Sequence, residues 1–358
     1  MRPAPVSTAI PVALVGAGMS ALGIHAPLIR SVDGLELVAV VARSEEGARR
    51  ASATGVVVVS SIAELAGVEP RPVVAIVATP DQRHVEHVAE LIALGIGAVV
   101  EKPLADTPES ARMLVARASD AGLPLVGFLN RRWDGDLLTV RSVVEQGSIG
   151  EPVLFESTIA RWAEGAAPGW RGEPLPSRVD GVLGGFGSHL VDQAITLFGP
   201  VERVYAEVGS RRAASAVPDD ALLLLRHQSG MRSHLRMTMV SSVEQPRFRL
   251  QGLGGAFEKH GFDGQQEALV RRREDPLDTG FGREPAELWG SLHSTEGVRR
   301  IETVPGVWRE FYLRLSAHLS GGPPAPAPVP LDEVVHGLDV LHAARASADS
   351  GESVRLGR

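Results

Sequence analysis

A chain of 358 residues with 36 Lys and Arg against 43 Asp and Glu has a formal charge of −7, which argues against a nucleic-acid-binding protein. A hydrophobic fraction of 44% excludes a disordered chain, and the length favours two domains over one. Cysteine is absent, which excludes disulfides and thiolate chemistry and fits a reducing compartment, so we expect a cytoplasmic protein.

The N-terminal region raises the question of a membrane segment. Residues 3–29 contain no Asp, Glu, Lys or Arg, a run long enough to span a bilayer or to act as a signal peptide. The same run contains residues that interrupt a continuous apolar helix, namely Pro5, Pro11, Gly16, Gly18, Gly23 and Pro27. A buried strand, a glycine turn and a helix explain this composition better, so we expect no contact with a membrane.

Short runs rich in Val and Ile alternate with amphipathic helices in the first third of the chain. The runs lie at 8–15, 35–41, 56–59, 73–78, 97–100 and 124–127. Such continuous apolar runs are typical of parallel strands buried on both faces. They predict a doubly wound, Rossmann-type α/β domain over residues 1–130, with ligands at the carboxyl ends of the strands.

The pattern changes after residue 130. Longer alternating runs lie at 153–162, 201–209, 221–227, 231–240 and 247–252, and a helix over 187–198 interrupts them. They predict a large open, mostly antiparallel sheet with one face in water. The Pro-rich run 320–330 connects to a last helix with an apolar face. We therefore predict an α+β domain over residues 131–358 for substrate binding and oligomerisation, with the last helix able to pack back on the first domain.

A GxGxxA motif, Gly16-Ala17-Gly18-Met19-Ser20-Ala21, follows the first strand and opens a helix. Glycines in this context let backbone N–H groups approach a pyrophosphate at the helix N-terminus. The motif predicts dinucleotide binding at Gly16, Gly18, Met19 and Ser20, and close packing of strand and helix is the alternative interpretation.

The end of the second strand bears on the choice between NADP and NAD. NAD sites usually place Asp or Glu there, to accept from the ribose 2′-hydroxyl. This strand ends Val41-Ala42-Arg43-Ser44 instead. Arg43 can pair with a 2′-phosphate and Ser44 can donate to it, which favours NADP, with NAD still possible. A solvated arginine followed by an N-cap serine is the alternative.

Glu101-Lys102-Pro103 directly follows the fifth strand. Only two of the 36 basic residues are lysine, Lys102 and Lys259, so a lysine at this position points to a property that arginine lacks. A lysine can release a proton when a nearby cation lowers its pKa, whereas a guanidinium cannot. We predict that Lys102 is catalytic, and a salt bridge with Glu101 is the alternative.

Gly187-Ser188-His189-Leu190-Val191-Asp192 opens the helix over 187–198. His189 and Asp192 are three residues apart and share one face, so Asp192 can orient an imidazole that exchanges a proton with a substrate hydroxyl. A buried, satisfied histidine is the alternative. His84 and His87 are also three apart, but no further ligands group with them, so we expect no metal.

Together these residues resemble the Gfo/Idh/MocA family of NAD(P)-dependent oxidoreductases, which act on sugars, inositols and related polyols. The resemblance covers nearly the whole chain and is nearest the subgroup that contains NADP-dependent scyllo-inositol dehydrogenases. It is carried by the glycine turn with His25-Ala26-Pro27-Leu28-Ile29, Ala78-Thr79-Pro80-Asp81 with His84, Glu101-Lys102-Pro103, Asn130-Arg131-Arg132-Trp133-Asp134, Trp170-Arg171, Gly187–Gln193 and Phe257-Glu258-Lys259-His260-Gly261 with Gln265.

The resemblance implies hydride transfer between a carbinol carbon and nicotinamide C4. It implies that Lys102 relays a proton and that His189 is the acid or base at the reacting hydroxyl. It places Thr79, Pro80, His84, Glu101 and Asn130 along the cofactor, and Trp162, Trp170 and Arg171 near a small-molecule substrate. It also implies a homodimer or homotetramer formed through the open sheet.

One position departs from the family. The family usually has Asp four residues before this histidine, and this chain has Gly185. Asp192 and Asp180 are candidates to replace it. Since loss of an acid or base costs about 10²- to 10⁴-fold in rate, two alternatives stay open: a nucleotide-binding regulatory protein, and a reductase of an imine or enol.

Overall fold

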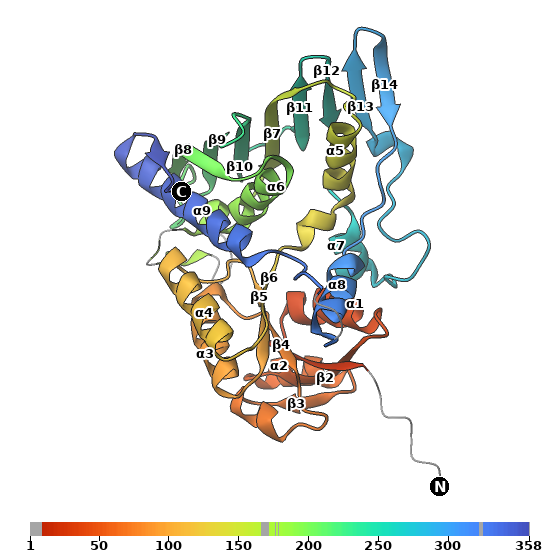
Figure 1. The fold of residues 1–358 in the computed structure, drawn as a ribbon, viewed down its shortest axis with the longest axis vertical. Helices are drawn as coiled ribbons and strands as arrows, with labels where there is room; N and C mark the ends of the chain where they lie inside the picture. Colours follow the sequence, from red (N-terminus) through yellow and green to blue (C-terminus); the bar gives the residue numbers. More distant parts are fainter. Residues whose placement is uncertain (1–8, 166–171, 176, 178, 322–324, 358) are drawn as a thin grey trace.

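The computed structural model describes residues 9–165, 172–175, 177, 179–321 and 325–357. Two sheets dominate it, one in each half of the chain (Figure 1).

The first sheet, sheet A, is entirely parallel. Its strands are β1 (Ile10–Val15), β2 (Leu35–Val41), β3 (Val57–Val59), β4 (Val74–Val77), β5 (Gly97–Glu101) and β6 (Leu125–Phe128). They lie in the order β3-β2-β1-β4-β5-β6, so the direction of winding reverses between β1 and β4. This confirms the predicted Rossmann fold, in which ligands bind at that reversal.

The helices around sheet A are α1 (Ala26–Arg30), α2 (Glu45–Ser52), α3 (His84–Ala93) and α4 (Pro108–Asp120). Two of them begin at the caps that their sequences provide: Ser44 Oγ accepts from the amide of Gly47, and Thr107 Oγ1 accepts from that of Ser110, each at 3.1 Å. The helix predicted after the glycine turn is divided, because a π-helical turn, η1 (Ala21–His25), precedes α1.

The second sheet, sheet B, has the order β14-β13-β12-β11-β7-β10-β9-β8-β15. Its strands are β7 (Pro152–Ala160), β8 (Val201–Gly209), β9 (Asp220–His227), β10 (Arg232–Thr238), β11 (Phe248–Gly252), β12 (Gly255–Lys259), β13 (Gly290–Ser294), β14 (Gly297–Ile301) and β15 (Val354–Arg355). All its pairs are antiparallel except β7 with β10, which confirms the mostly antiparallel sheet.

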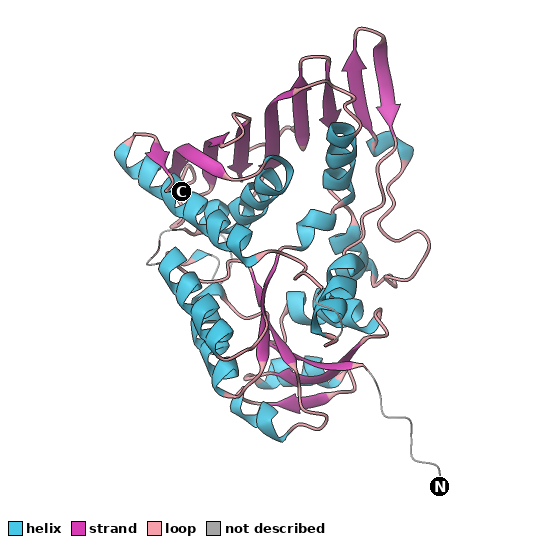
Figure 2. Cartoon of the chain, viewed as in Figure 1, coloured by secondary structure: helices cyan, strands magenta, loops and turns pink. Residues whose placement is uncertain are grey.

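Helices cover one face of sheet B (Figure 2). These are α5 (Gly135–Glu145), α6 (Ser188–Phe198) and α9 (Leu331–Ser350), which lie on the side that faces the first domain. In β9, Leu223 and Leu225 are buried beneath them, whereas Leu222 and Arg226 point the other way and are exposed. The alternation read from the sequence therefore corresponds to one packed and one open face.

Two late helices return to the first domain. Phe311 and Tyr312 of α8 (Arg309–Leu319) are fully buried in the core around sheet A. The helix α9 contributes to both cores, with Leu338 in the first and Leu341 in the second, as the apolar face of the last helix led us to expect. In the part of the chain that the structure describes, no helix is long and apolar enough to cross a membrane.

Candidate functional site

A cleft of about 1240 Å³ lies between the carboxyl ends of the sheet A strands and the inner face of sheet B. It gathers most of the residues that the sequence singled out. Those on its wall are Gly16, Gly18, Met19, Ser20, Arg43, Ser44, Thr79, Pro80, Glu101, Lys102, Asn130 and His189.

The glycine turn forms the floor of the cleft beside β1 and β4. Gly16 has a φ of +113°, and a Cβ at this residue would lie 2.8 Å from the carbonyl oxygen of Ala78, so only glycine fits there. At Gly18, by contrast, a Cβ would meet no atom within 4 Å, because that side of the backbone faces the open cleft. The turn thus leaves room for a pyrophosphate against its backbone.

Arginines surround the part of the cleft next to the end of β2. Arg43 follows the strand directly, and Arg50 of α2 and Arg83 before α3 also reach the wall. Burial lowers the pKa of His87 to about 4, and the charges of Arg83 and Arg43 add to the effect. This is a positive environment suited to a phosphate group.

Glu101, at the end of β5, is held by two side chains from the segment that follows β1. It accepts from Ser20 Oγ in the glycine turn and lies 3.2 Å from Nε2 of His25, whose Nδ1 lies 2.8 Å from the hydroxyl of Tyr312 in α8. Burial would raise the pKa of Glu101, but its hydrogen bond and charge interaction with His25, with Ser20 and Lys102 adding to them, lower it to about 2. Glu101 is therefore ionised at neutral pH and anchors the turn.

Lys102 reaches from the first domain to the second. Its Nζ donates to the carbonyl oxygen of Gly185 at 2.8 Å. Gly185 belongs to a π-helical turn, η6 (Leu183–Gly187), that leads directly into α6, and π-helical turns are frequent at functional sites.

The glycines of η6 differ in the space around them. A Cβ at Gly184 would lie 2.5 Å from the carbonyl oxygen of Val179, so this glycine is required by packing. A Cβ at Gly185 would meet nothing within 4 Å, and Gly185 is not among the glycines with positive φ. A side chain at position 185 would therefore enter open space in the cleft. The backbone conformation does not require glycine there.

His189 lies one helical turn after Gly185 and on the same wall of the cleft. Burial lowers its pKa well below the usual 6.5, and the positive charges of Lys102, Arg131 and Arg247 lower it further. Its Nδ1 is buried and has no hydrogen-bond partner among the described residues. The imidazole is thus neutral at pH 7 and retains polar capacity for a ligand.

Two of the predicted residues, His84 and Trp162, do not line the cleft. The ring of His84 is fully buried behind the cleft, 2.8 Å from the carbonyl oxygen of Pro103 and 3.0 Å from that of Thr79, so it holds the loop and not the ligand. The side chain of Trp162 is 61% exposed and does not line the cleft.

Asp192 does not orient His189. Its carboxylate accepts two hydrogen bonds from Arg132 Nε, at 3.0 and 3.1 Å, and one from Arg132 Nη2 at 2.5 Å. Arg132 also pairs with Glu333 of α9 at 2.7 Å. The predicted catalytic role of Asp192 is corrected by this geometry, because the carboxylate is buried in a salt bridge outside the cleft. Trp170 and Arg171, predicted near the substrate, lie outside the described residues.

Asp180, the other candidate to replace the family carboxylate, does line the cleft. Its Oδ2 accepts from the amide of Leu175 at 2.9 Å. Among the described residues, no group of three or more histidines and acids is arranged to hold a metal.

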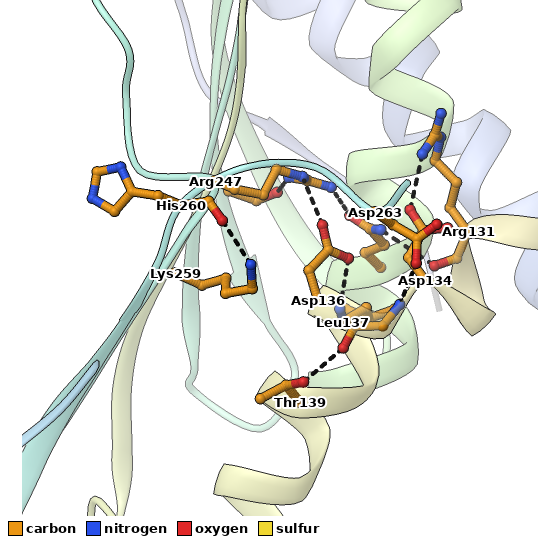
Figure 3. A network of polar contacts seen from close by, with 12 residues as sticks. Arg131, Asp134, Asp136, Leu137, Thr139, Arg247, Lys259, His260 and Asp263 are labelled. Carbon is orange, nitrogen blue, oxygen red and sulfur yellow. Dashed lines mark hydrogen bonds and ion pairs between the residues drawn. The ribbon is translucent and has the colours of Figure 1, made fainter. Parts of the chain in front are cut away.

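Sequence reasoning missed several arginines that line the cleft on the side of sheet B. Arg131 pairs with Asp134 at 2.9 Å, and Arg247 lies 3.7 Å from Asp136 (Figure 3). Arg247 also donates to Ser157 and Gln193. Arg131 was visible within Asn130–Asp134, where only Asn130 was assigned a role. Arg247 comes from a position 58 residues after His189, and no local pattern marks it.

Comparisons with known proteins agree with this geometry. A family model described as an oxidoreductase family with NAD-binding Rossmann fold matches residues 10–127, and the GFO/IDH/MocA C-terminal domain matches residues 137–258. An oxidoreductase of Schizosaccharomyces pombe is 30% identical, over 98% of this chain and 100% of its own. The scyllo-inositol 2-dehydrogenase (NADP+) of Bacillus subtilis is 28% identical over 97% of this chain and 96% of its own.

The fold also has close counterparts among solved structures. That of yvaA, an oxidoreductase from Bacillus subtilis, superimposes with a TM-score of 0.90 at 27% identity, covering 99% of this chain and 100% of that one.

Proposed function

Because this chain belongs to the Gfo/Idh/MocA family of NAD(P)-dependent oxidoreductases, we propose that it transfers a hydride between NADP(H) and the carbinol carbon of a sugar, inositol or related polyol. One observation carries the proposal. Lys102, from the end of β5, contacts the turn that carries Gly185 and leads to His189, so two groups able to move protons share one wall of a cleft that begins at a dinucleotide turn.

The residues of the first domain fit a dinucleotide. The backbone at Gly18 is open to the cleft, as a pyrophosphate requires, and Asn130 lies further along the same wall. NADP is favoured over NAD because β2 ends in Arg43-Ser44, and because Arg50 and Arg83 line the same part of the cleft. The scyllo-inositol relative is named for NADP+, which supports the same preference.

The side chains at the other end of the cleft supply the proton chemistry. The bound nicotinamide would supply the hydride acceptor or donor. In the oxidative direction the neutral imidazole of His189 accepts the hydroxyl proton while the carbinol carbon loses its hydride, which leaves a ketone. Lys102 donates to the oxygen on which charge develops, and Glu101 keeps a negative charge beside Lys102. The proton that His189 has taken then leaves by relay, because Lys102 releases a proton to water in the cleft and takes the one from the imidazolium.

Gly185 supports a second candidate. Among the described residues, no carboxylate contributes to the pKa of His189, and the space beside Gly185 is open. A regulatory protein that binds NADP(H) without turnover, or a reductase of an imine or enol, would have less need of such a carboxylate.

The test is a panel of inositols, aldoses and keto-sugars with NADP+ or NADPH, followed at the nicotinamide absorbance. The proposal expects turnover on at least one carbinol–ketone pair, and loss of that turnover in His189→Ala. Tight NADPH binding by calorimetry with no turnover on the panel would favour the regulatory protein. Turnover confined to imines would favour the reductase of an imine or enol.

The open face of sheet B supports assembly of identical chains. No described helix lies over this face, and Leu222 of β9 is exposed on it. An uncovered sheet face with apolar residues is typical of an interface, so the chain is expected to form a homodimer or homotetramer. Light scattering coupled to size exclusion measures the mass, and a monomer at micromolar concentration would contradict the expectation.

A further inference from the structure

Arg161 is placed on the cleft wall with a fixed backbone. It follows β7 directly, its amide donates to Thr238 at 2.9 Å, and its carbonyl accepts from Ser241 at 3.0 Å. Its guanidinium lies 4.9 Å from the centre of the Phe262 ring, which also lines the cleft. The ring supports the flat guanidinium from one side and leaves its N–H groups directed outward.

Within the described part of the chain, the guanidinium of Arg161 has no acidic or carbonyl partner, unlike the guanidinium groups of its neighbours. Arg131 is paired with Asp134, Arg212 with Asp219 at 2.8 Å, and Arg247 is bonded to Ser157 and Gln193. Among the described residues, no carboxylate or carbonyl accepts from the Arg161 side chain. The side chain is exposed on the cleft wall, and partial desolvation together with the positive charges of Arg131 and Arg271 lowers its pKa.

The other cations at the reacting end of the cleft have acids beside them. Arg131 pairs with Asp134 and Arg212 with Asp219, Arg247 lies 3.7 Å from Asp136, and the charge of Lys102 acts on Glu101. Arg161 is exposed on this wall and has no ion-pair partner among the described residues. An exposed guanidinium without a protein carboxylate is available to an anionic ligand that enters the cleft.

Resting on the hydride-transfer function above, we propose that the substrate of this enzyme carries an anionic group, a carboxylate or a phosphate, and that Arg161 binds it. A guanidinium offers paired N–H donors that match either group, and with its aromatic support it is already held in place. The substrate class is then sugar acids or phosphorylated polyols, and Arg161 is the residue that selects them over neutral polyols.

The experiment compares neutral and anionic substrates in matched sets, with NADP+ at saturation. The sets are D-glucose with D-glucuronate and D-glucose 6-phosphate, and myo-inositol with myo-inositol 1-phosphate. Selection by Arg161 predicts kcat/KM about tenfold or more higher for an anionic member than for its neutral counterpart, from the strength of a charged hydrogen bond. The carboxylate and phosphate members distinguish the two sources of charge.

Variants then assign the effect. Arg161→Gln should raise KM for the anionic substrate about 10- to 100-fold while leaving kcat and the KM of the neutral counterpart within about twofold, and Arg161→Lys should restore part of the loss. Arg226→Gln is the matched control, because Arg226 is exposed on the opposite face of sheet B. Raised salt should weaken the binding of the anionic substrate and leave the binding of the neutral substrate unchanged.

The outcomes separate this inference from the function on which it rests. Calorimetric binding of glucuronate or glucose 6-phosphate to the NADP+ complex, lost in Arg161→Gln but without turnover, supports the anion site and contradicts hydride transfer. Turnover of neutral polyols at kcat/KM equal to that of the anions, or equal effects of Arg161→Gln on both, overturns the anion site and keeps the function. Absence of binding by all the anionic compounds also overturns it.

Discussion

Lys102 Nζ donates a 2.8 Å hydrogen bond to the carbonyl oxygen of Gly185, and this contact joins the end of β5 to the π-helical turn before α6. The reacting end of the cleft is therefore assembled from both halves of the chain. A lysine makes this contact with one of its three N–H bonds.

Lys102→Arg should remove most turnover and leave cofactor affinity within a few-fold. The guanidinium keeps the charge but cannot release a proton near neutral pH. A loss of about 100-fold or more in kcat is expected, measured beside the Kd for NADPH by fluorescence. Full activity in the variant would show that Lys102 acts only as a fixed charge.

Gly185→Asp should be accepted by the fold and raise turnover on simple inositols or sugars. Its side chain enters open space one helical turn before His189, where a carboxylate can align the hydroxyl. NADPH affinity should stay nearly unchanged. Gly184→Ala is the contrasting variant and should lower the melting temperature, since its Cβ would lie 2.5 Å from Val179 O. A folded Gly185→Asp that binds NADPH and gains nothing on neutral polyols argues against a simple polyol dehydrogenase.

NADPH should bind more tightly than NADH, and Arg43→Ala should remove the difference. We expect the Kd for NADPH to rise about tenfold with little change for NADH, since a charged hydrogen bond to the 2′-phosphate is lost. Arg49→Ala is the control, because Arg49 is exposed on α2 but does not line the cleft. Equal affinities for the two cofactors in the unmodified enzyme would refute the assignment.

The pH dependence of oxidation should report the lowered pKa of His189. The neutral imidazole is the proton acceptor, so the rate falls as pH drops through the folded-state pKa and is unaffected by this group above it. The acidic limb of kcat/KM should therefore have its midpoint below pH 6.5. A midpoint above 6.5 that disappears in His189→Gln would mean that the imidazole is not shielded by burial and cations.

Asp192→Ala should reduce stability and spare chemistry. It removes a buried carboxylate from Arg132, and breaking such a pair costs about 3 kcal/mol in the free energy of unfolding. Urea denaturation measures the loss, and kcat of the folded fraction should stay within a few-fold. A stable variant with a large fall in kcat would return Asp192 to the catalytic group.

The sequence predicted the positions of the strands better than the contacts of the side chains. The strands of sheet A lie within two residues of their predicted positions, because fully buried parallel strands leave continuous Val and Ile runs. The strands β12, β13, β14 and β15 were not predicted. In β14, Gly297–Ile301 is mostly exposed and contains two arginines, so no alternation marks it. The π-helical turns have no period that a helical pattern would reveal.

For the site, residues that follow strand ends were found, because parallel topology alone brings them together. The exact partners of long side chains were not. The pattern at 189–192 predicts that Asp192 faces the imidazole, yet Arg132, sixty residues earlier, captures the carboxylate. No motif marks Arg161 in the sequence, and its proposed role comes from its position on the cleft wall beside Phe262.

The helix α9 also has a mechanical consequence. It packs into both cores, and its Asp339 and Glu333 pair with Arg112 of α4 and Arg132, so it braces one half of the molecule against the other. These contacts oppose hinge motion between the halves, so the width of the cleft does not depend on a bound ligand. Heating should therefore melt both halves in one calorimetric transition rather than two.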